Sequence, residues 1–344
     1  MDMLGIGNLL VTTSFWKTIL EWFVSFMGNY GWAIILFTVA LKLILFPLDL
    51  IQRRTSKKNM QMQAVVQPEI AALQKKYPND KDKINQGTME IYKKHNYNVV
   101  GSCVVMLVNL VVTLVVFFTL FQALNYISQD KLVSQYTELQ AVYQQESTDE
   151  AKREAVLDQY ELIKDENGWL WITNVWKADT NTSIMLSFNE YYKQAGLNLE
   201  EAEKEAARQE YEAIEDIIYS SEANSGWNGY FILIVLAGAV TFLSQYITSK
   251  SMKPKTQAGQ PDPTASTNKV MLILMPIIML IFAWTSTSVF ALYLITNSLM
   301  TVLTGLVINK ILKDKDYTAG SSKNPPKKTK VQVMEYSRNY FKGE

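Results

Sequence analysis

The residue types that most often perform catalysis or bind metals are scarce in this chain. Its 344 residues include one cysteine, Cys103, and one histidine, His95. A nucleophile–base pair or a histidine-based metal site needs more of these side chains than the chain contains. No glycine-rich nucleotide-binding loop is present either. We therefore expect no catalytic residue, no metal and no cofactor, and we interpret His95 as a solvated residue and Cys103 as an inert one.

The polar residues with functional potential lie inside long apolar segments. An ionisable residue within a membrane span is costly and is a functional-site hypothesis by default, and Lys42 is such a residue. Three other apolar segments carry polar residues four apart, on one helix face: Asn109 and Thr113, Thr241 and Gln245, and Tyr293 and Asn297. Such stripes can hold helices together through hydrogen bonds, or they can line a water-filled cavity. Lys42 can also be a passive topology anchor. The spacing of the residues decides neither between the two roles of the stripes nor between the two roles of Lys42.

The segments that must position these residues are nearly free of charge. A helix needs about 20 predominantly apolar residues to cross a bilayer. Five segments meet this requirement, namely 30–50, 103–127, 230–247, 270–287 and 289–309. The last two come from one uncharged block that is broken near 285–288. The sequence therefore predicts an all-α polytopic membrane protein with five transmembrane helices and with its termini on opposite sides of the membrane.

The charges between these segments predict an orientation. The chain has 33 basic and 33 acidic residues, and this net charge of zero argues against nucleic acid as the main partner of the whole chain. Segment 51–100 has ten basic and four acidic residues, the connector 249–269 four and one, the tail 310–344 nine and four, but segment 129–227 eight and 21. Basic residues near span ends stay in the cytoplasm. We expect the first three segments in the cytoplasm, and the N-terminus and segment 129–227 outside.

The cytoplasmic segment 51–100 predicts an antiparallel helical hairpin. Its first helix, 59–76, carries an apolar stripe that includes Met62 and Ile70 at helical spacing. Pro78 lies in the turn that ends this helix. The return helix is expected at 83–95.

The outer parts have a different character. Segment 1–29 mixes tryptophans and other apolar residues with three charged residues, Asp2, Lys17 and Glu21, so we expect a helix that lies at the outer membrane surface, with a poorly ordered extension as the alternative. Segment 129–227 is acidic and predicts a helical insertion. Its three clustered tryptophans, Trp169, Trp171 and Trp176, suit either a strip against the membrane face or the small core of an outer domain.

The order of these parts resembles the YidC family of membrane protein insertases. The resemblance covers about 230 residues and is carried by the combination of several short segments rather than by one motif. These are 28–32, 38–42, 46–48, 67–70, 89–93, 101–103, 230–233 and 275–277, together with Gly238, Gln245, Trp284, Tyr293 and Asn297.

The resemblance implies an insertase and chaperone without bond chemistry. It implies five core helices around a positively charged hydrophilic groove that opens to the cytosol and to lipid but is closed to the outside. The groove residues would be Lys42, Asn109, Thr113, Thr241, Gln245, Tyr293 and Asn297. Client contacts on the hairpin would involve Met60, Met62, Pro68 and Tyr92, and ribosome or lipid contacts Lys327, Lys328 and Lys330.

The partners implied are nascent membrane proteins, membrane lipid, the ribosome and the Sec translocation channel, with no small-molecule substrate. The implied location is the plasma membrane of a bacterium, with the N-terminus outside and the C-terminus in the cytoplasm. A small-solute transporter or channel is the alternative, and a receptor-like membrane protein is a further one.

The chain departs from the family pattern at four places, one of which is Asn109, where the family usually has a glutamine. Lys42 stands where the family has an arginine, which keeps the charge but loses the planar guanidinium fork. Valines at 99, 105 and 111 stand where prolines are common, so we expect a straighter second span. The outer segment is also longer than is usual, with helical insertions on both sides of its tryptophan strip.

Overall fold

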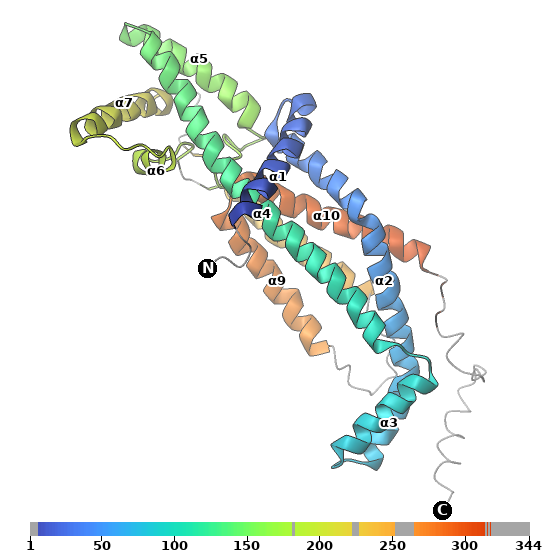
Figure 1. Cartoon of the computed structure of the whole chain (residues 1–344). Coiled ribbons are helices and arrows are strands. Elements are labelled where there is room, and N and C mark those ends of the chain that lie inside the picture. Colours follow the sequence, from blue (N-terminus) through green and yellow to red (C-terminus); the bar gives the residue numbers. More distant parts are fainter. Residues whose placement is uncertain are drawn as a thin grey trace, which may run out of the picture. The chain divides into compact units, whose positions relative to one another are not determined.

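The computed structural model describes residues 6–180, 183–221, 227–251, 265–313, 315 and 317. The predicted tail contacts Lys327, Lys328 and Lys330 lie outside these residues. The described part is helical without a strand, and Figure 1 shows its long helices. The helices are α1 (Ile6–Met27), α2 (Tyr30–Lys76), α3 (Lys81–Lys94), α4 (Val99–Gln145), α5 (Asp149–Asn167), α6 (Phe188–Gln194), α7 (Glu201–Tyr219), α8 (Ile232–Ser251), α9 (Ala265–Thr285) and α10 (Ser288–Ile311).

Several of these helices suit a membrane. Within the described residues, α2, α4, α8 and α10 are long and apolar enough to cross a bilayer. The apolar stretch of α9, Leu272–Thr285, is shorter and falls in the segment predicted as the fourth span. The chain is thus an all-α polytopic membrane protein, as the sequence predicts. The membrane boundaries and the interfacial placement of α1 stay predictions.

Two helices extend well beyond the predicted spans. Helix α2 continues from the first span into the hairpin, with Pro47 and Pro68 in its interior. Helix α4 likewise continues from the second span into the acidic segment, without an interior proline. Neither 48–58 nor 128–145 contains a glycine, an asparagine or a proline, so the residues that interrupt helices most strongly are missing there. In both helices the sequence changes from apolar to charged where the predicted span ends, and the helix continues through this change.

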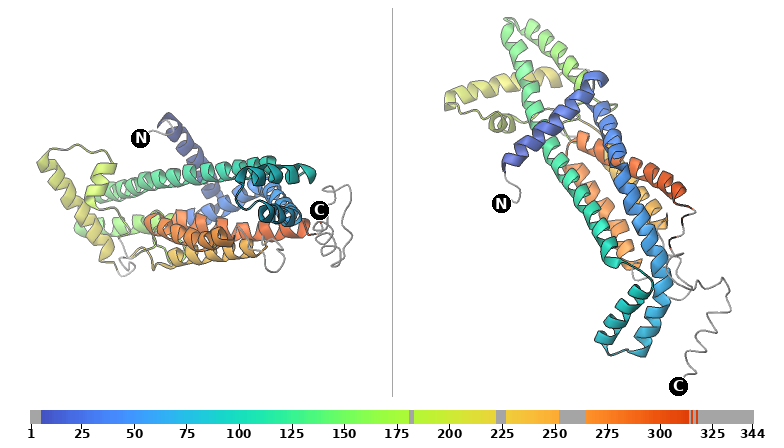
Figure 2. Two further views of the ribbon diagram at one scale, coloured as in Figure 1. Left: turned by 90° about the horizontal axis from the view of Figure 1, so that it is seen from below. Right: turned by 45° about the vertical axis from the view of Figure 1, so that its right-hand side comes forward.

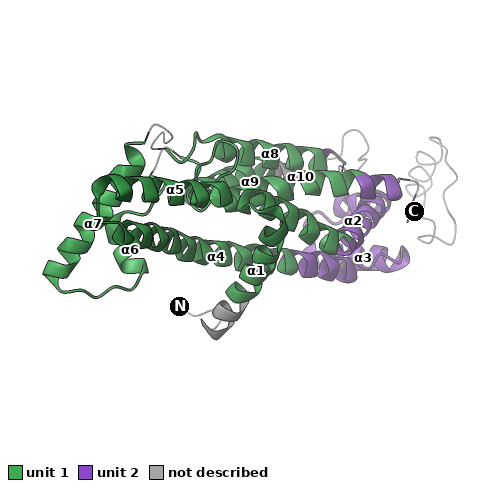
Figure 3. Ribbon diagram, turned by 90° about the horizontal axis from the view of Figure 1, so that it is seen from above, with its two compact units in different colours: residues 1–46, 111–249, 263–306 green, residues 47–110, 250–262, 307–344 purple. Residues whose placement is uncertain are grey.

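The chain divides into two compact units, which Figure 3 colours separately. Unit 1 comprises Met1–Phe46, Val111–Ser249 and Pro263–Leu306, and unit 2 comprises Pro47–Leu110, Lys250–Asp262 and Val307–Glu344. Each unit has its own cluster of buried apolar residues.

Aromatic rings join the helices of unit 1. Phe117 of α4 lies 5.6 Å from Phe282 of α9, and Phe121 lies 4.9 Å from Phe290 of α10. Helices α8, α9 and α10 run side by side in both views of Figure 2. Gly238 permits the approach of α8 to α9, because a Cβ atom there would lie 3.0 Å from Leu280.

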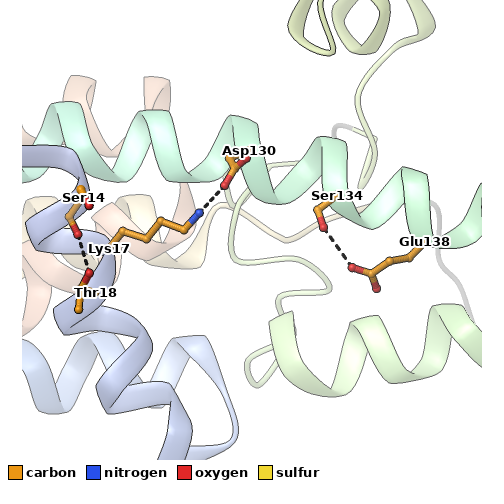
Figure 4. Close-up of polar contacts among 6 residues, drawn as sticks. All are labelled: Ser14, Lys17, Thr18, Asp130, Ser134 and Glu138. Atoms are coloured by element: carbon orange, nitrogen blue, oxygen red, sulfur yellow. Dashed lines mark hydrogen bonds and ion pairs between the residues drawn. The ribbon is translucent and has the colours of Figure 1, made fainter. Parts of the chain in front are cut away.

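Helix α1 is tied to α4 by an ion pair. The Lys17 ammonium lies 2.6 Å from the Asp130 carboxylate, as Figure 4 shows. This hydrogen bond raises the pKa of Lys17 above its usual range, although burial works in the other direction. Both side chains are partly exposed, so we expect the pair to contribute at most about 1 kcal/mol.

Unit 2 contains the predicted hairpin. The apolar stripe packs as expected, with Met62 2%, Val66 1% and Ile70 7% exposed against the return helix and Tyr97. The hairpin turn ends with Asp80, whose carboxylate caps α3 by accepting the N–H of Lys83 at 3.0 Å.

The interpretation of His95 as a solvated residue is wrong. His95 is 6% exposed, and its Nε2 lies 2.8 Å from the Glu69 carboxylate. Lys94 reaches the same carboxylate at 3.0 Å. Burial alone would raise the pKa of Glu69, but the hydrogen bonds from Lys94 and His95 lower it below its usual range. His95 therefore fastens α3 to the hairpin part of α2.

Candidate functional site

The apolar helices of unit 1 pack closely at one end only. On α2, Ala33, Ile34 and Phe37 are at most 4% exposed, whereas Leu43 is 60% and Ile44 74% exposed. The packed end is the one at which Tyr30 meets Trp176 of the acidic segment, with ring centroids 4.9 Å apart.

Helices α4 and α10 repeat this asymmetry. On α4, Leu120, Leu124 and Ile127 are 1% exposed, and Val115, towards the other end, is 54% exposed. On α10, all residues from Val289 to Leu294 are at most 4% exposed, whereas beyond them buried positions such as Thr304 alternate with Leu299, Leu303 and Leu306, which are about half exposed. Unit 1 therefore has a packed end, next to the acidic segment, and an open end.

The stretch 167–180, between α5 and α6, joins the helices at the packed end. Its backbone carbonyls accept hydrogen bonds from the start of α10, from Ser288 to Lys177 at 2.8 Å and from Val289 to Val175 at 2.9 Å. The Asp179 carboxylate, 1% exposed, accepts the N–H groups of Tyr230 and Leu233 at the start of α8, at 2.7 and 2.5 Å.

The burial of the tryptophans in this stretch distinguishes between a strip against the membrane face and the core of an outer domain. Trp176 is 1% exposed, and its indole N–H donates to the Asn167 side chain at 2.7 Å. Trp169 and Trp171 are half-buried and pack against the core of unit 1. The structure therefore favours the core interpretation over a strip that lies against the membrane.

Four predicted groove residues lie just beyond the packed end. Lys42 follows Phe37 by five residues, or about 7.5 Å of helix, and is half-buried. Asn297 follows Leu294 by three residues on α10 and is half-buried, as is Gln245 on α8. Thr113 lies two turns from Leu120 on α4 and is exposed. The border between packed and open helix thus carries one cation and several polar groups.

Two other predicted groove residues are buried within unit 1. Thr241 is 7% exposed, and its hydroxyl lies 3.3 Å from that of Ser298, so it joins α8 to α10. Tyr293 is 4% exposed and packs beside Phe290, with centroids 5.7 Å apart. For Thr241, the contact matches the alternative in which polar stripes hold helices together.

Asn109 belongs to unit 2 and lies one helical turn from Thr113 on α4. Its side chain is 8% exposed.

The hairpin residues predicted to meet a client differ in their exposure. Pro68 is exposed, and Met60 and Tyr92 are half-buried. Met62 is 2% exposed and forms the hairpin core, so its predicted client contact stays a prediction. The position of Met62 in the apolar stripe of the first hairpin helix is the sequence signal that predicts this burial.

Unit 2 also fixes the chain after α10. The Lys57 ammonium donates to the carbonyl of Leu312 and, at 3.1 Å, to that of Lys313. Gln61 exchanges two hydrogen bonds with the backbone, to the carbonyl of Lys315 at 3.2 Å and from the N–H of Tyr317 at 2.8 Å. A cation at the C-terminus of a helix also complements its dipole.

Comparison with known proteins identifies the family of this chain. A family model described as "60Kd inner membrane protein" matches residues 22–315. Proteins named "Membrane protein insertase YidC" are similar over shorter stretches. The one from Thioalkalivibrio sulfidiphilus is 34% identical over 121 residues, which are 35% of this chain and 21% of that protein. The one from Geotalea uraniireducens is 41% identical over 107 residues, 31% of this chain and 19% of that protein.

A third relative, from Pelobacter propionicus, is 40% identical over 107 residues, 31% of this chain and 18% of that protein. The aligned parts thus span about a fifth of the length of these relatives.

Proposed function

The chain belongs to the 60Kd inner membrane protein family, which includes the YidC proteins, and we propose that it is a membrane protein insertase and chaperone. In this role it helps hydrophobic segments of newly made proteins to enter the plasma membrane of a bacterium. It forms and breaks no covalent bond.

The asymmetry of unit 1 is the observation that best supports this function. Helices α2, α4 and α10 are packed at one end and open at the other, and Lys42 is half-buried just beyond the packed end. A segment that approaches from the open end can therefore leave water without a continuous pore through the protein.

The physical task is to lower the cost of moving polar peptide into hydrocarbon. Each backbone polar group without a partner costs several kcal/mol in the bilayer core. Polar side chains such as Gln245 and Asn297 supply partners, and Lys42 attracts the carboxylates of a client's hydrophilic part. The client's apolar segment remains in contact with lipid and passes sideways into the bilayer.

The remaining parts take supporting roles in this proposal. The packed end, with α5, α6 and α7, lies outside, and the hairpin lies in the cytoplasm, where Met60, Pro68 and Tyr92 meet the client. The basic tail, including Lys327, Lys328 and Lys330, contacts the ribosome or anionic lipid. The Sec channel is a further partner. No contact described above favours the transporter alternative, which requires a polar path through the packed end.

Growth of a bacterium depleted of its own YidC protein tests the function. We expect the wild type and the Lys42→Arg variant to restore growth, because both keep the charge, and Lys42→Ala to restore it less well. Immunoblotting of membrane fractions verifies equal amounts. Failure of the well-expressed wild type to restore growth contradicts the insertase function. Full growth with Lys42→Ala leaves that function intact but removes Lys42 from the mechanism.

A further inference from the structure

A cleft with a mixed polar and apolar lining opens at the packed end of unit 1, where α9 ends and α8 and α10 begin. It has a volume of about 630 Å³ and is lined by α4, by the stretch that ends at Thr180, and by the turn between α9 and α10. The proposed function of the open end does not use this cleft.

Among the described residues that line the cleft, Lys177 is the one that carries a charge. Its side chain is half-buried, and burial lowers the pKa of its ammonium group despite the charge of Glu190. Among the described residues no carboxylate forms an ion pair with Lys177. The Glu190 carboxylate instead accepts the N–H and O–H of Ser187, each at 2.9 Å.

The other nearby carboxylates are also engaged. That of Asp179 accepts the N–H groups at the start of α8, and that of Asp130 pairs with Lys17. Burial disfavours the charged form of Lys177 and no described carboxylate pairs with it, so the cleft suits a negatively charged ligand.

Ser286 provides an independent indication of a ligand. Its side chain is 4% exposed and lines the cleft, yet its hydroxyl has no hydrogen-bond partner within the described structure. A buried hydroxyl without a partner costs about 1–3 kcal/mol. The first N–H groups of α10 already donate to the backbone carbonyls of Lys177 and Val175, so side chains, rather than these N–H groups, would hold the ligand.

Aromatic residues place the cleft at the level of lipid headgroups. Trp284 is 59% exposed and Phe231 39% exposed, and both line the cleft. The adjacent Tyr230 is 53% exposed. Exposed tryptophan and tyrosine at the ends of apolar helices are typical of the membrane–water interface. The ligand therefore reaches the cleft from the headgroup layer.

We propose that this cleft binds the phosphodiester group of phosphatidylglycerol, or of a lipid of the same chemistry, from the leaflet at the packed end. Lys177 neutralises the phosphate, Ser286 donates a hydrogen bond to it, and Asn125 and Gln129 face the glycerol hydroxyls. The described residues of the lining offer a cation and no carboxylate, so we expect phosphatidylethanolamine, with its ammonium headgroup, to be the poorer ligand. This site is independent of the insertase function.

Lipid retention measures this binding directly. The full chain is reconstituted in vesicles of equal parts phosphatidylglycerol and phosphatidylethanolamine, extracted in mild detergent, and analysed by native mass spectrometry. We expect one phosphatidylglycerol to be retained by the wild type and by Lys193→Gln, a control that removes an exposed charge from the same segment. Lys177→Gln should reduce its retention roughly tenfold, the value of one charged hydrogen bond.

Ser286→Ala gives a second, nearly isosteric test that leaves the fold intact, and it should reduce retention severalfold. Equal retention by the wild type, Lys177→Gln and Ser286→Ala would overturn the site. Equal retention of both lipids by the wild type would overturn its headgroup preference. If inorganic phosphate at millimolar concentration displaces the lipid completely, the cleft is a site for a free anion and the lipid assignment is wrong.

Discussion

The carboxylate of Asp179 ties the acidic segment to the start of α8. It is 1% exposed and receives three N–H groups, those of Tyr230, Phe231 and Leu233. Gly229 is part of this arrangement, because a Cβ atom there would lie 1.9 Å from the Asp179 carboxylate. The partners are more than fifty residues away in sequence, so no local pattern could have identified Asp179.

We predict that Asp179→Ala lowers the free energy of unfolding by roughly 2–3 kcal/mol, because it leaves buried N–H groups without an acceptor. Asp179→Asn should lose less, since one acceptor oxygen remains. Thermal unfolding in detergent, followed by tryptophan fluorescence, measures both. Asp158→Asn, at an exposed position of α5, should change nothing, and a similar shift for it and for Asp179→Ala would contradict this role.

The lowered pKa of Glu69 predicts that the stability of the hairpin decreases at acidic pH. Its pKa is lower in the folded hairpin than in the unfolded chain, so its stabilising contribution is complete above the unfolded value of about 4.3. The contribution is lost as the pH falls through the lower folded value. The difference in melting temperature between wild type and Glu69→Gln should therefore be largest at neutral pH and shrink towards pH 3. A difference that stays constant over this range would be inconsistent with the ion-pair role.

For single residues, the sequence predicts which positions of a helix are buried, but not which distant residues they contact. The apolar stripe with Met62 and Ile70 followed from helical spacing and is buried as expected. The role of His95 could not be predicted, because its partner Glu69 lies 26 residues away. For Thr241, spacing alone could not separate a groove residue from one that joins two helices.

Among the elements, the chain after α10 depends on the hairpin part of α2. Lys57 donates to two carbonyls directly after α10, those of Leu312 and Lys313, and Gln61 bonds the backbone that follows. The apolar pattern predicted both helices, but α2 continues without a break to Lys76. Composition indicates where a helix leaves the membrane but not where it ends.

We predict that Lys57→Gln accelerates tryptic cleavage after Lys310 and Lys313 severalfold, because the last turn of α10 loses a charge-assisted bond of about 1.5–3 kcal/mol. Timed digestion with mass spectrometry gives the cleavage rates. Lys58→Gln is the matched control, since the neighbouring Lys58 is exposed. Unchanged cleavage in Lys57→Gln would show that this contact does not hold the segment.

For the whole molecule, the distribution of charge predicts the orientation. Glu146 and Asn79 are exposed, so each can be replaced by a single cysteine in a Cys103→Ser background. We expect a membrane-impermeant maleimide to label the position in the acidic segment in intact cells, and the position in the hairpin only after lysis. The reverse pattern would contradict the predicted topology and place the open end of unit 1 outside.

The central claim is that unit 1 transfers a client from its open end, past Lys42, into lipid. Insertion of a single-span client with an acidic hydrophilic part, into liposomes that contain only this protein, tests it most directly. Protection of the client from added protease is the readout. We predict protection well above that in protein-free liposomes, with Lys42→Arg close to the wild type and Lys42→Ala lower. Protection no greater than in protein-free liposomes, with folded and correctly oriented protein, would contradict the claim.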